Sequence, residues 1–221
     1  MNNFDFFELC RTGSKLKISK AIADGVDVNA TDEEERTALM YVAESNTNVD
    51  IIKALIEAGA DVNVRDSNGR TALMYATKSN PNVDIIKALI EAGADVNIRD
   101  NNGLTALMYF AESTLNTDII RVLIEAKADI NIRDNNGRTA LMHVVSMEKN
   151  AIHTSCFIAC VLMNYGADAH ITDNEGKGVM DYAKDGNLFY RKKLMEHIGY
   201  IDYINYLKFI HSQEAVQNQK E

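Results

Sequence analysis

Apolar residues recur at helical spacing in short runs that are separated by polar turn residues. The stretch 84–92 places four isoleucine and leucine residues on one face of a predicted helix. The shorter apolar run 72–76 predicts a short buried helix that begins after Thr71, whose hydroxyl is available to cap the first turn. Gly93 follows the longer run directly, where a left-handed residue commonly ends a helix. The turn residues of 95–102 then predict a tight hairpin-like finger.

This unit is repeated along the chain at a fixed spacing of 34 residues. Segments 35–63 and 69–97 differ at only five positions. The motif Thr-Ala-Leu-Met begins at Thr37, Thr71, Thr105 and Thr139. Self-similarity at such a period predicts an array of stacked helix-turn-helix units rather than one irregular core.

The repeated residues resemble the consensus of the ankyrin-repeat family. One unit carries Asp66-x-x-Gly69-x-Thr71-Ala-Leu-Met-x-Ala76, and later Gly-Ala-Asp-Val-Asn at 93–97. The resemblance implies an all-α solenoid of stacked helix-turn-helix units joined by β-hairpin-like loops. Two features depart from it. The family's Pro-Leu-His is Ala-Leu-Met here, so we expect methionine packing in place of a histidine bridge, and the period is 34 rather than 33.

The alignment of the units predicts a single domain over residues 1–211. Within it we expect an N-terminal cap at 4–31, repeats at 32–65, 66–99, 100–133 and 134–172, and a C-terminal capping unit at 173–211. The cap is predicted as two short helices, and the fourth repeat holds five extra residues around 147–152. A helix over 200–210 is expected to close the array, and the polar tail 212–221 is expected to be disordered.

Charge and cysteine content narrow the classes of partner. The net charge of −9 disfavours nucleic acid and anionic lipid as partners. No apolar stretch approaches the roughly 20 residues that a spanning helix needs, and no signal peptide is visible at the start. The odd number of cysteines argues for a reducing compartment. We therefore expect a cytoplasmic monomer that contacts neither nucleic acid nor membrane, and the residue usage is similar to that of bacterial family members.

Sites of catalysis or metal binding are hard to find in the sequence. It contains no phosphate-binding glycine loop, nucleophile elbow or Cys-x-x-Cys pair. His153, Cys156 and Cys160 suggest a metal cluster, but the repeat alignment places Cys156 at a packing position and Cys160 at a surface position. A structural zinc site also wants four converging ligands. We therefore predict no catalytic residue, no metal and no cofactor.

Three groups of residues allow a structural and a functional interpretation. The column Tyr41, Tyr75, Tyr109 and Tyr182 favours packing between repeats over ligand stacking. The column Arg65, Arg99 and Arg133 stands beside aspartates, which favours surface ion pairs over a grip on an acidic peptide. The acidic run 32–35 favours a solvated loop tip over a docking site.

The resemblance implies a non-catalytic module that binds another protein on the concave surface of the fingers and first helices. Alternatives are a regulatory or inhibitory subunit of an enzyme and a structural spacer. By position, the candidate surface comprises Glu33, Glu34, Arg36, Glu44, Ser67, Asn68, Arg70, Lys78, Asn101, Asn102, Leu104, Glu112, Asn135, Asn136 and Arg138. Charge reversal at Arg70 and Arg138 is expected to weaken partner binding without lowering the melting temperature.

Overall fold

The computed structural model describes residues 3–80, 82–111, 116–146, 152–183, 192–202 and 204–205. These residues fall into two compact units, which divide between Ala140 and Leu141. Each unit is described by itself below. The domain boundaries that the repeat alignment suggests stay a prediction. The predicted insertion around 147–152 and the end of the helix expected over 200–210 lie largely outside the described residues, and the tail 212–221 lies wholly outside them.

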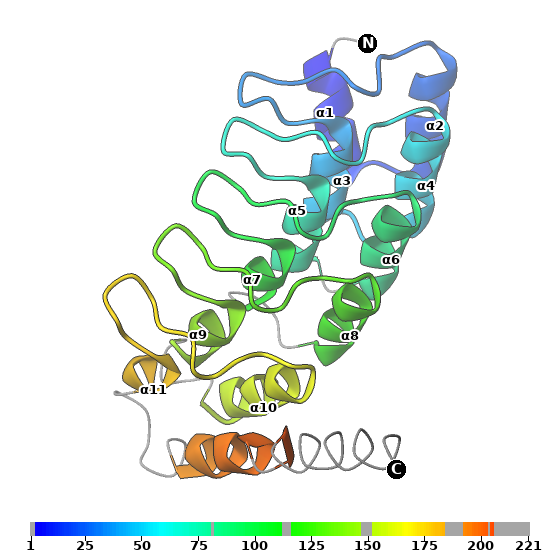
Figure 1. Ribbon diagram of the computed structural model, residues 1–221. Coiled ribbons are helices and arrows are strands. Elements are labelled where there is room, and N and C mark those ends of the chain that lie inside the picture. The colour runs from blue at the N-terminus through cyan, green and yellow to red at the C-terminus, as the bar shows by residue number, and fades with distance from the viewer. Residues whose placement is uncertain are drawn as a thin grey trace, which may run out of the picture. The chain divides into compact units, whose positions relative to one another are not determined.

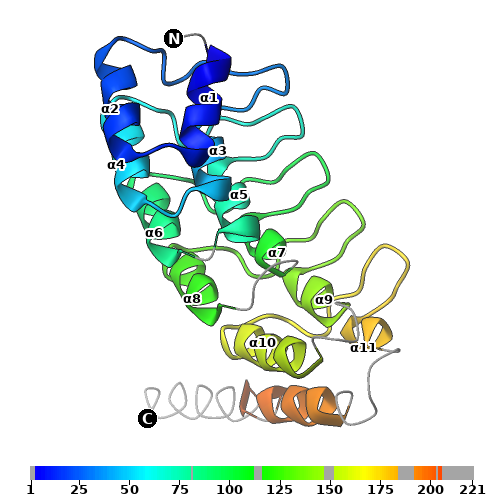
Figure 2. The same ribbon diagram turned by 180° about the vertical axis from the view of Figure 1, so that it is seen from behind.

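Helix pairs build the first unit, in the order that the repeats predict. The pairs are α1 (Asn3–Thr12) with α2 (Lys15–Ala23), α3 (Ala38–Ser45) with α4 (Val49–Glu57), α5 (Ala72–Ser79) with α6 (Val83–Glu91), and α7 (Ala106–Ala111) with α8 (Thr117–Glu125). Figure 1 shows α1, α3, α5 and α7 in one layer and α2, α4, α6 and α8 in a second layer. The fingers extend from the side of the first layer, as the view from behind in Figure 2 also shows. The predicted all-α ankyrin-type architecture is confirmed.

The core of the first unit lies between the two helix layers. Ile85, Ile86 and Leu89 of α6 are fully buried there, because the helical period places them on one face. Met74 and Met108, which stand where the family has histidine, are at most 2% exposed. The burial of both side chains agrees with the methionine packing that the sequence predicts.

The helix termini differ in one respect from the sequence prediction. Thr71 stands at the N-cap of α5, but its side chain makes no capping hydrogen bond. The second helices α4, α6 and α8 are capped by asparagine. At α6, the Asn82 side chain accepts a hydrogen bond from the Asp84 backbone N–H at 3.0 Å. Gly93 follows α6 with φ at +90°, which is the left-handed conformation that the sequence predicts there.

The asparagine that ends each Gly-Ala-Asp-Val-Asn motif joins neighbouring repeats. The Asn63 side chain donates to the Gly93 carbonyl at 3.0 Å and accepts from the Asp95 backbone N–H at 2.9 Å. Asn29 makes the same two contacts one repeat earlier. Each such side chain uses its donor and its acceptor on the next repeat, so the loops are fixed at the repeat spacing.

Two residues take a left-handed conformation where other repeats have glycine. Lys127 has φ at +68° at the position of Gly59 and Gly93, and Glu35 has φ at +62° at the position of Gly69. A residue with a Cβ atom loses roughly 1–2 kcal/mol in this conformation. Each of these two residues is therefore less favourable for the backbone than the glycine of the neighbouring repeats.

Replacing Glu35 with glycine is expected to raise the free energy of unfolding by about 1 kcal/mol, because glycine removes the Cβ strain. Lys127→Gly is the matched comparison and should give a gain of similar size. Urea denaturation of the full chain measures both changes. A loss of stability in the Glu35→Gly variant would show that the glutamate side chain itself stabilises the finger.

The second unit contains α10 (Ile152–Asn164), α11 (Val179–Tyr182) and a helix over 192–202, while α9 (Ala140–Val145) spans the division between the units. Leu162 of α10 and Leu194 of the last helix are at most 1% exposed. The His170 ring nitrogen Nε2 lies 3.1 Å from the Asp202 carboxylate. This contact ties the loop after α10 to the helix 192–202.

The hydrogen bond from Asp202 raises the pKa of His170 above its usual value of 6.5, and the charge of Asp168 acts in the same direction. The contact therefore stabilises the second unit below about pH 6.5 and loses this effect as the pH rises through the raised pKa. Because both side chains are more than half exposed, the gain should stay below about 1 kcal/mol. An NMR titration should show a lower His170 pKa in the Asp202→Asn variant, and an unchanged value would contradict the contact.

Candidate functional site

Each finger is held by an aspartate at its base. The carboxylate atom Oδ1 of Asp100 accepts from the backbone N–H groups of Asn102 at 2.9 Å and of Leu104 at 2.8 Å. Asp66 makes the same pair of bonds in the preceding finger. The carboxylate thus satisfies two backbone donors of the turn.

The tyrosine column completes this arrangement. The Tyr109 hydroxyl donates to the second carboxylate oxygen of Asp100 at 2.7 Å, and the Tyr75 hydroxyl donates to Asp66 at 2.6 Å. Burial, and then the aspartate, raises the pKa of both tyrosines. Tyr75 and Tyr109 are at most 7% exposed. These tyrosines join the finger to the first helix, in keeping with the packing role that the sequence favours.

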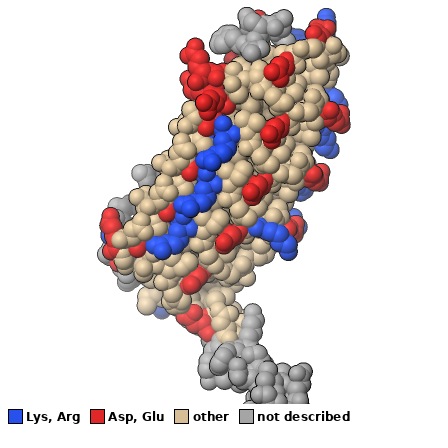
Figure 3. All heavy atoms as spheres, turned by 45° about the horizontal axis from the view of Figure 1, so that its top comes forward, with Lys and Arg blue, Asp and Glu red and all other residues tan. Residues whose placement is uncertain are grey.

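The exposed arginine column runs across the repeats. Figure 3 shows a stripe of basic side chains with acidic side chains beside it. The Arg65 guanidinium donates to the Gly69 carbonyl at 3.2 Å and to the Arg99 carbonyl at 3.1 Å. Arg99 donates to the Gly103 carbonyl at 3.4 Å and to the Asn135 side chain at 3.2 Å. The sequence suggests ion pairs between these arginines and the adjacent aspartates. Arg65 and Arg99 make these contacts with oxygen atoms of the fingers instead.

Neighbouring fingers are hydrogen-bonded near their tips. The Asn101 backbone N–H donates to the Asn68 carbonyl, and its side-chain amide donates to the Ser67 carbonyl at 3.0 Å. Asn135 repeats both contacts on the carbonyls of Asn102 and Asn101. Asn101 and Asn135, which the sequence places on the binding surface, therefore use their amide groups to fix one finger to the next.

The other tip position of each finger is left available. Asn68, Asn102 and Asn136 are exposed, and among the described residues no hydrogen bond involves their side chains. Their neighbour along the same column is Glu34 in the first finger, which is also exposed. We call this column of Glu34, Asn68, Asn102 and Asn136 the tip column. Fixed backbone with unused polar side chains is suited to contacts with another molecule.

Three arginines of the predicted binding surface make contacts within the protein, namely Arg36, Arg70 and Arg138. The Arg36 guanidinium carbon lies 4.2 Å from the Tyr41 ring centroid, and Arg36 pairs with Glu44 at 2.5 Å. The same atom of Arg70 lies 5.7 Å from the centroid of the Tyr109 ring. Arg138 pairs with Asp134 at 3.1 Å, and that aspartate side chain is only 1% exposed.

Charge reversal at Arg138 would place a second carboxylate against buried Asp134, and at Arg70 it would remove a cation from the tyrosine column. Either change is therefore expected to lower stability, so these two variants are poor probes of binding. Two further candidates differ in position. Lys78 is exposed, with its amine 5.4 Å from the Tyr109 ring centroid, and Leu104 is half-buried. Glu112 lies outside the described residues.

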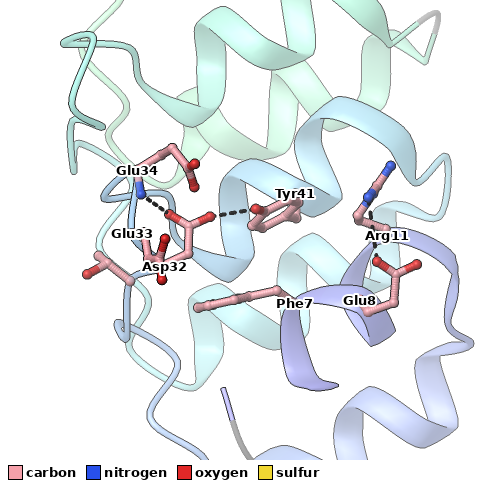
Figure 4. Close-up of a pocket in the computed structure, with 8 residues that line it drawn as sticks. Phe7, Glu8, Arg11, Asp32, Glu33, Glu34 and Tyr41 are labelled. Carbon is pink, nitrogen blue, oxygen red and sulfur yellow. Dashed lines mark hydrogen bonds and ion pairs between the residues drawn. The ribbon is translucent and has the colours of Figure 1, made fainter. Parts of the chain in front are cut away.

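A groove of about 630 Å³ lies between α1 and the first finger, and we call it the first-finger groove. Figure 4 shows Phe7 and Tyr41 between the acidic side chains of the finger and the Glu8–Arg11 pair of α1. It is lined by Phe7, Glu8, Arg11, Thr31, Asp32, Glu33, Glu34 and Tyr41. Burial and the hydrogen bond to Asp32 raise the pKa of Tyr41 to about 12, so this hydroxyl stays protonated at neutral pH.

The described residues offer little for reactive chemistry. Burial raises the pKa of the Cys10 thiol to about 12, so its nucleophilic thiolate is not formed near neutral pH. No three or more of the described histidine, cysteine, aspartate and glutamate side chains gather into a group that could hold a metal ion. The side chains of His153 and Cys156 are not among those described. Within the described ranges, no helix has both the length and the apolar character to cross a membrane.

Comparison with known proteins identifies related molecules. A family model of ankyrin repeats in three copies matches residues 7–100 and 80–173. The ankyrin repeat protein EF0377 is 27% identical, with a TM-score of 0.76, over 90% of this chain and 98% of that chain. A chain of the complex between the predatory endopeptidase Bd0816 of Bdellovibrio bacteriovorus and the immunity protein Bd3460 is 26% identical, with a TM-score of 0.73, over 86% of this chain and 96% of that chain. Curated protein sequences include no match.

Proposed function

The chain belongs to the ankyrin-repeat family, and from that premise we propose that it is a non-catalytic protein that binds a partner protein on its fingers and first helices. Ankyrin repeats serve as protein-interaction modules. Stacked repeats provide one extended surface, and neighbouring repeats can each contribute contacts to the same partner.

The proposal rests on a difference within each finger between the residues that fix its conformation and the exposed side chains that make no hydrogen bond within the described part of the chain. Asp100 and Tyr109 fix the finger from within, and Asn135 joins it to the next. The exposed side chain of Asn102 takes part in none of these contacts. A rigid frame with unused side chains at regular spacing lowers the entropy cost of binding, because little of the surface must be ordered on contact.

A capture experiment with matched variants tests this proposal. The full chain is immobilised, a partner is captured from lysate of the source organism and identified, and its affinity is then measured with purified components. The tip variant, Asn68→Ala/Asn102→Ala/Asn136→Ala, truncates the three asparagine side chains of the tip column. It is expected to weaken partner binding at least about tenfold, as loss of central interface contacts does. The melting temperature should stay unchanged, because these side chains support no other part of the structure.

The control variant removes three exposed side chains from the second helix layer, as Lys53→Ala/Glu57→Ala/Glu91→Ala. It is expected to bind the partner as the original chain does. Equal binding by the tip variant and the original chain would refute the assignment of the surface. Equal losses in the tip and control variants would indicate non-specific association.

An inhibitory partner of an enzyme is a second candidate function. It is favoured by the similarity to a chain of the structure that contains an endopeptidase and an immunity protein. If the captured partner is a hydrolase, adding the original chain should lower its activity. Adding the tip variant in its place should leave that activity largely unchanged. A captured hydrolase that stays fully active in the complex would rule out inhibition.

A further inference from the structure

The first finger differs from the other fingers of the first unit in the charge of its tip. Its tip residues are Glu33 and Glu34, whereas the next finger has Ser67 and Asn68. The two following fingers have asparagine at both positions. Glu35 adds a further exposed carboxylate, although glycine stands at its position in those fingers. The acidic tip is thus confined to the finger that borders the first-finger groove.

The carboxylates around this groove are not all equivalent. Asp32 points to its own finger, because it accepts from the backbone N–H of Glu34 at 3.0 Å and from the Tyr41 hydroxyl. Glu8 pairs with Arg11 at 3.5 Å on α1. Among the described residues, Glu33 and Glu34 have no ion-pair partner. The groove therefore has two carboxylates on its finger side that are available to a cation.

The groove also has an aromatic wall. Phe7 stacks on Tyr41, with ring centroids 5.5 Å apart and the planes at 24°. Phe7 is 6% exposed and Tyr41 is half-buried. Such a wall suits the aliphatic part of a long side chain, and the carboxylates at its edge suit a charged end. Lysine and arginine have both parts, whereas an acidic or phosphorylated segment would be repelled.

We infer that the first-finger groove binds a lysine or arginine side chain of the partner protein, with its stem against Phe7 and Tyr41 and its charge beside Glu33 and Glu34. This inference rests on the proposed function and specifies the chemistry of the partner at one end of the surface. Charge complementarity selects this occupant. The arrangement assigns a basic segment of the partner to the first finger and neutral polar contacts to the rest of the tip column.

A titration with short peptides tests the groove without the natural partner. The basic probe is Gly-Lys-Arg-Lys-Gly with both ends blocked, and the neutral probe has glutamine in place of its three basic residues. Amide NMR signals of Phe7, Thr31, Glu33, Glu34 and Tyr41 should shift saturably with the basic probe and not with the neutral one. Increasing salt should weaken this binding, because the charges are exposed.

The isosteric variant Glu33→Gln/Glu34→Gln removes the two charges and keeps the shape. It is expected to lower the affinity for the basic probe roughly five- to tenfold, since each exposed ion pair contributes a few tenths to 1 kcal/mol. The control Glu57→Gln/Glu91→Gln removes two exposed charges from α4 and α6 and should bind as the original chain does. Equal weakening in both variants would overturn the inference, as would probe shifts spread over other acidic residues.

Two further results separate this inference from the proposed function. In the first, Ca²⁺ binds saturably in the groove and displaces the basic probe at millimolar Ca²⁺ concentration. That result would assign the site to a metal ion and overturn the inference of a basic side chain. If the captured partner binds Glu33→Gln/Glu34→Gln as tightly as the original chain but loses the tip variant, the groove inference fails and the proposed function stands. If Glu33→Gln/Glu34→Gln weakens both the basic probe and the partner while the tip variant binds the partner as the original chain does, the groove inference stands and the proposed tip surface fails instead.

Discussion

Replacing Asp100 with alanine is expected to lower the free energy of unfolding by about 4 kcal/mol. The change leaves three donors without their acceptor, namely the backbone N–H groups of Asn102 and Leu104 and the Tyr109 hydroxyl. Asp100 and Tyr109 are at most 5% exposed, so water replaces the lost carboxylate poorly. A buried donor without a partner costs about 1–3 kcal/mol. Chemical denaturation of the full chain measures the loss.

Asp95→Ala is the matched control for this change. The Asp95 carboxylate is exposed and accepts one backbone N–H, that of Asn97 at 2.8 Å. Its removal should cost about 1 kcal/mol or less, because water can take over the single contact. The variant Asp100→Asn, which keeps an acceptor for the turn, should fall between the two alanine variants. Similar losses for Asp95→Ala and Asp100→Ala would contradict the role assigned to the finger aspartates.

The periodic pattern was sufficient to predict the helix pairs and the packing of the core. The run 84–92 becomes α6, Gly93 ends it in the left-handed conformation, and the methionine at Met74 is buried. These features depend on residues near one another in the chain or related by the repeat. Local spacing and self-similarity therefore contain the information that specifies them.

The contacts of the fingers could be predicted only in part, because they depend on directions that spacing does not determine. The guanidinium of Arg65 reaches carbonyl groups of its own and the next finger rather than neighbouring Asp66. Asn101 and Asn102 are adjacent and chemically identical, yet only Asn101 joins the preceding finger through its side-chain amide. The first-finger groove joins residues of α1 to a loop that follows at least 20 residues later, which a pattern within repeats cannot reveal.

The close approach of successive fingers leads to a second large effect. Gly103 has φ at +81°, and a Cβ atom there would lie 2.6 Å from the Arg99 guanidinium and 2.7 Å from the Asn135 backbone nitrogen. The side-chain oxygen of Asn135 would also lie 2.7 Å away. Gly103→Ala therefore adds overpacking of about 1–3 kcal/mol to the left-handed strain. Together these two effects predict that Gly103→Ala lowers the free energy of unfolding by about 3 kcal/mol, as measured by chemical denaturation.

Gly93→Ala is the control for this change. Gly93 has φ at +90°, but a Cβ atom there would meet no atom within 4 Å. The control should therefore lose only about 1 kcal/mol, which is the cost of the conformation, and the difference between the variants measures the approach of the next finger. Equal losses would show that the fingers separate freely.

The first finger indicates how this loss can be relieved. Glu35 occupies the position of Gly103, and the residues that correspond to Arg99 and Asn135 are Thr31 and Ser67. Both replacements are smaller, so they leave room for a side chain that the later fingers exclude. In a background that carries both Arg99→Thr and Asn135→Ser, Gly103→Ala should therefore cost less free energy of unfolding than it does in the original chain. The cost, measured against the same background with Gly103 intact, should fall to about that of Gly93→Ala in the original chain. An undiminished cost in that background would mean that the backbone of the next finger, and not the two side chains, excludes the Cβ atom.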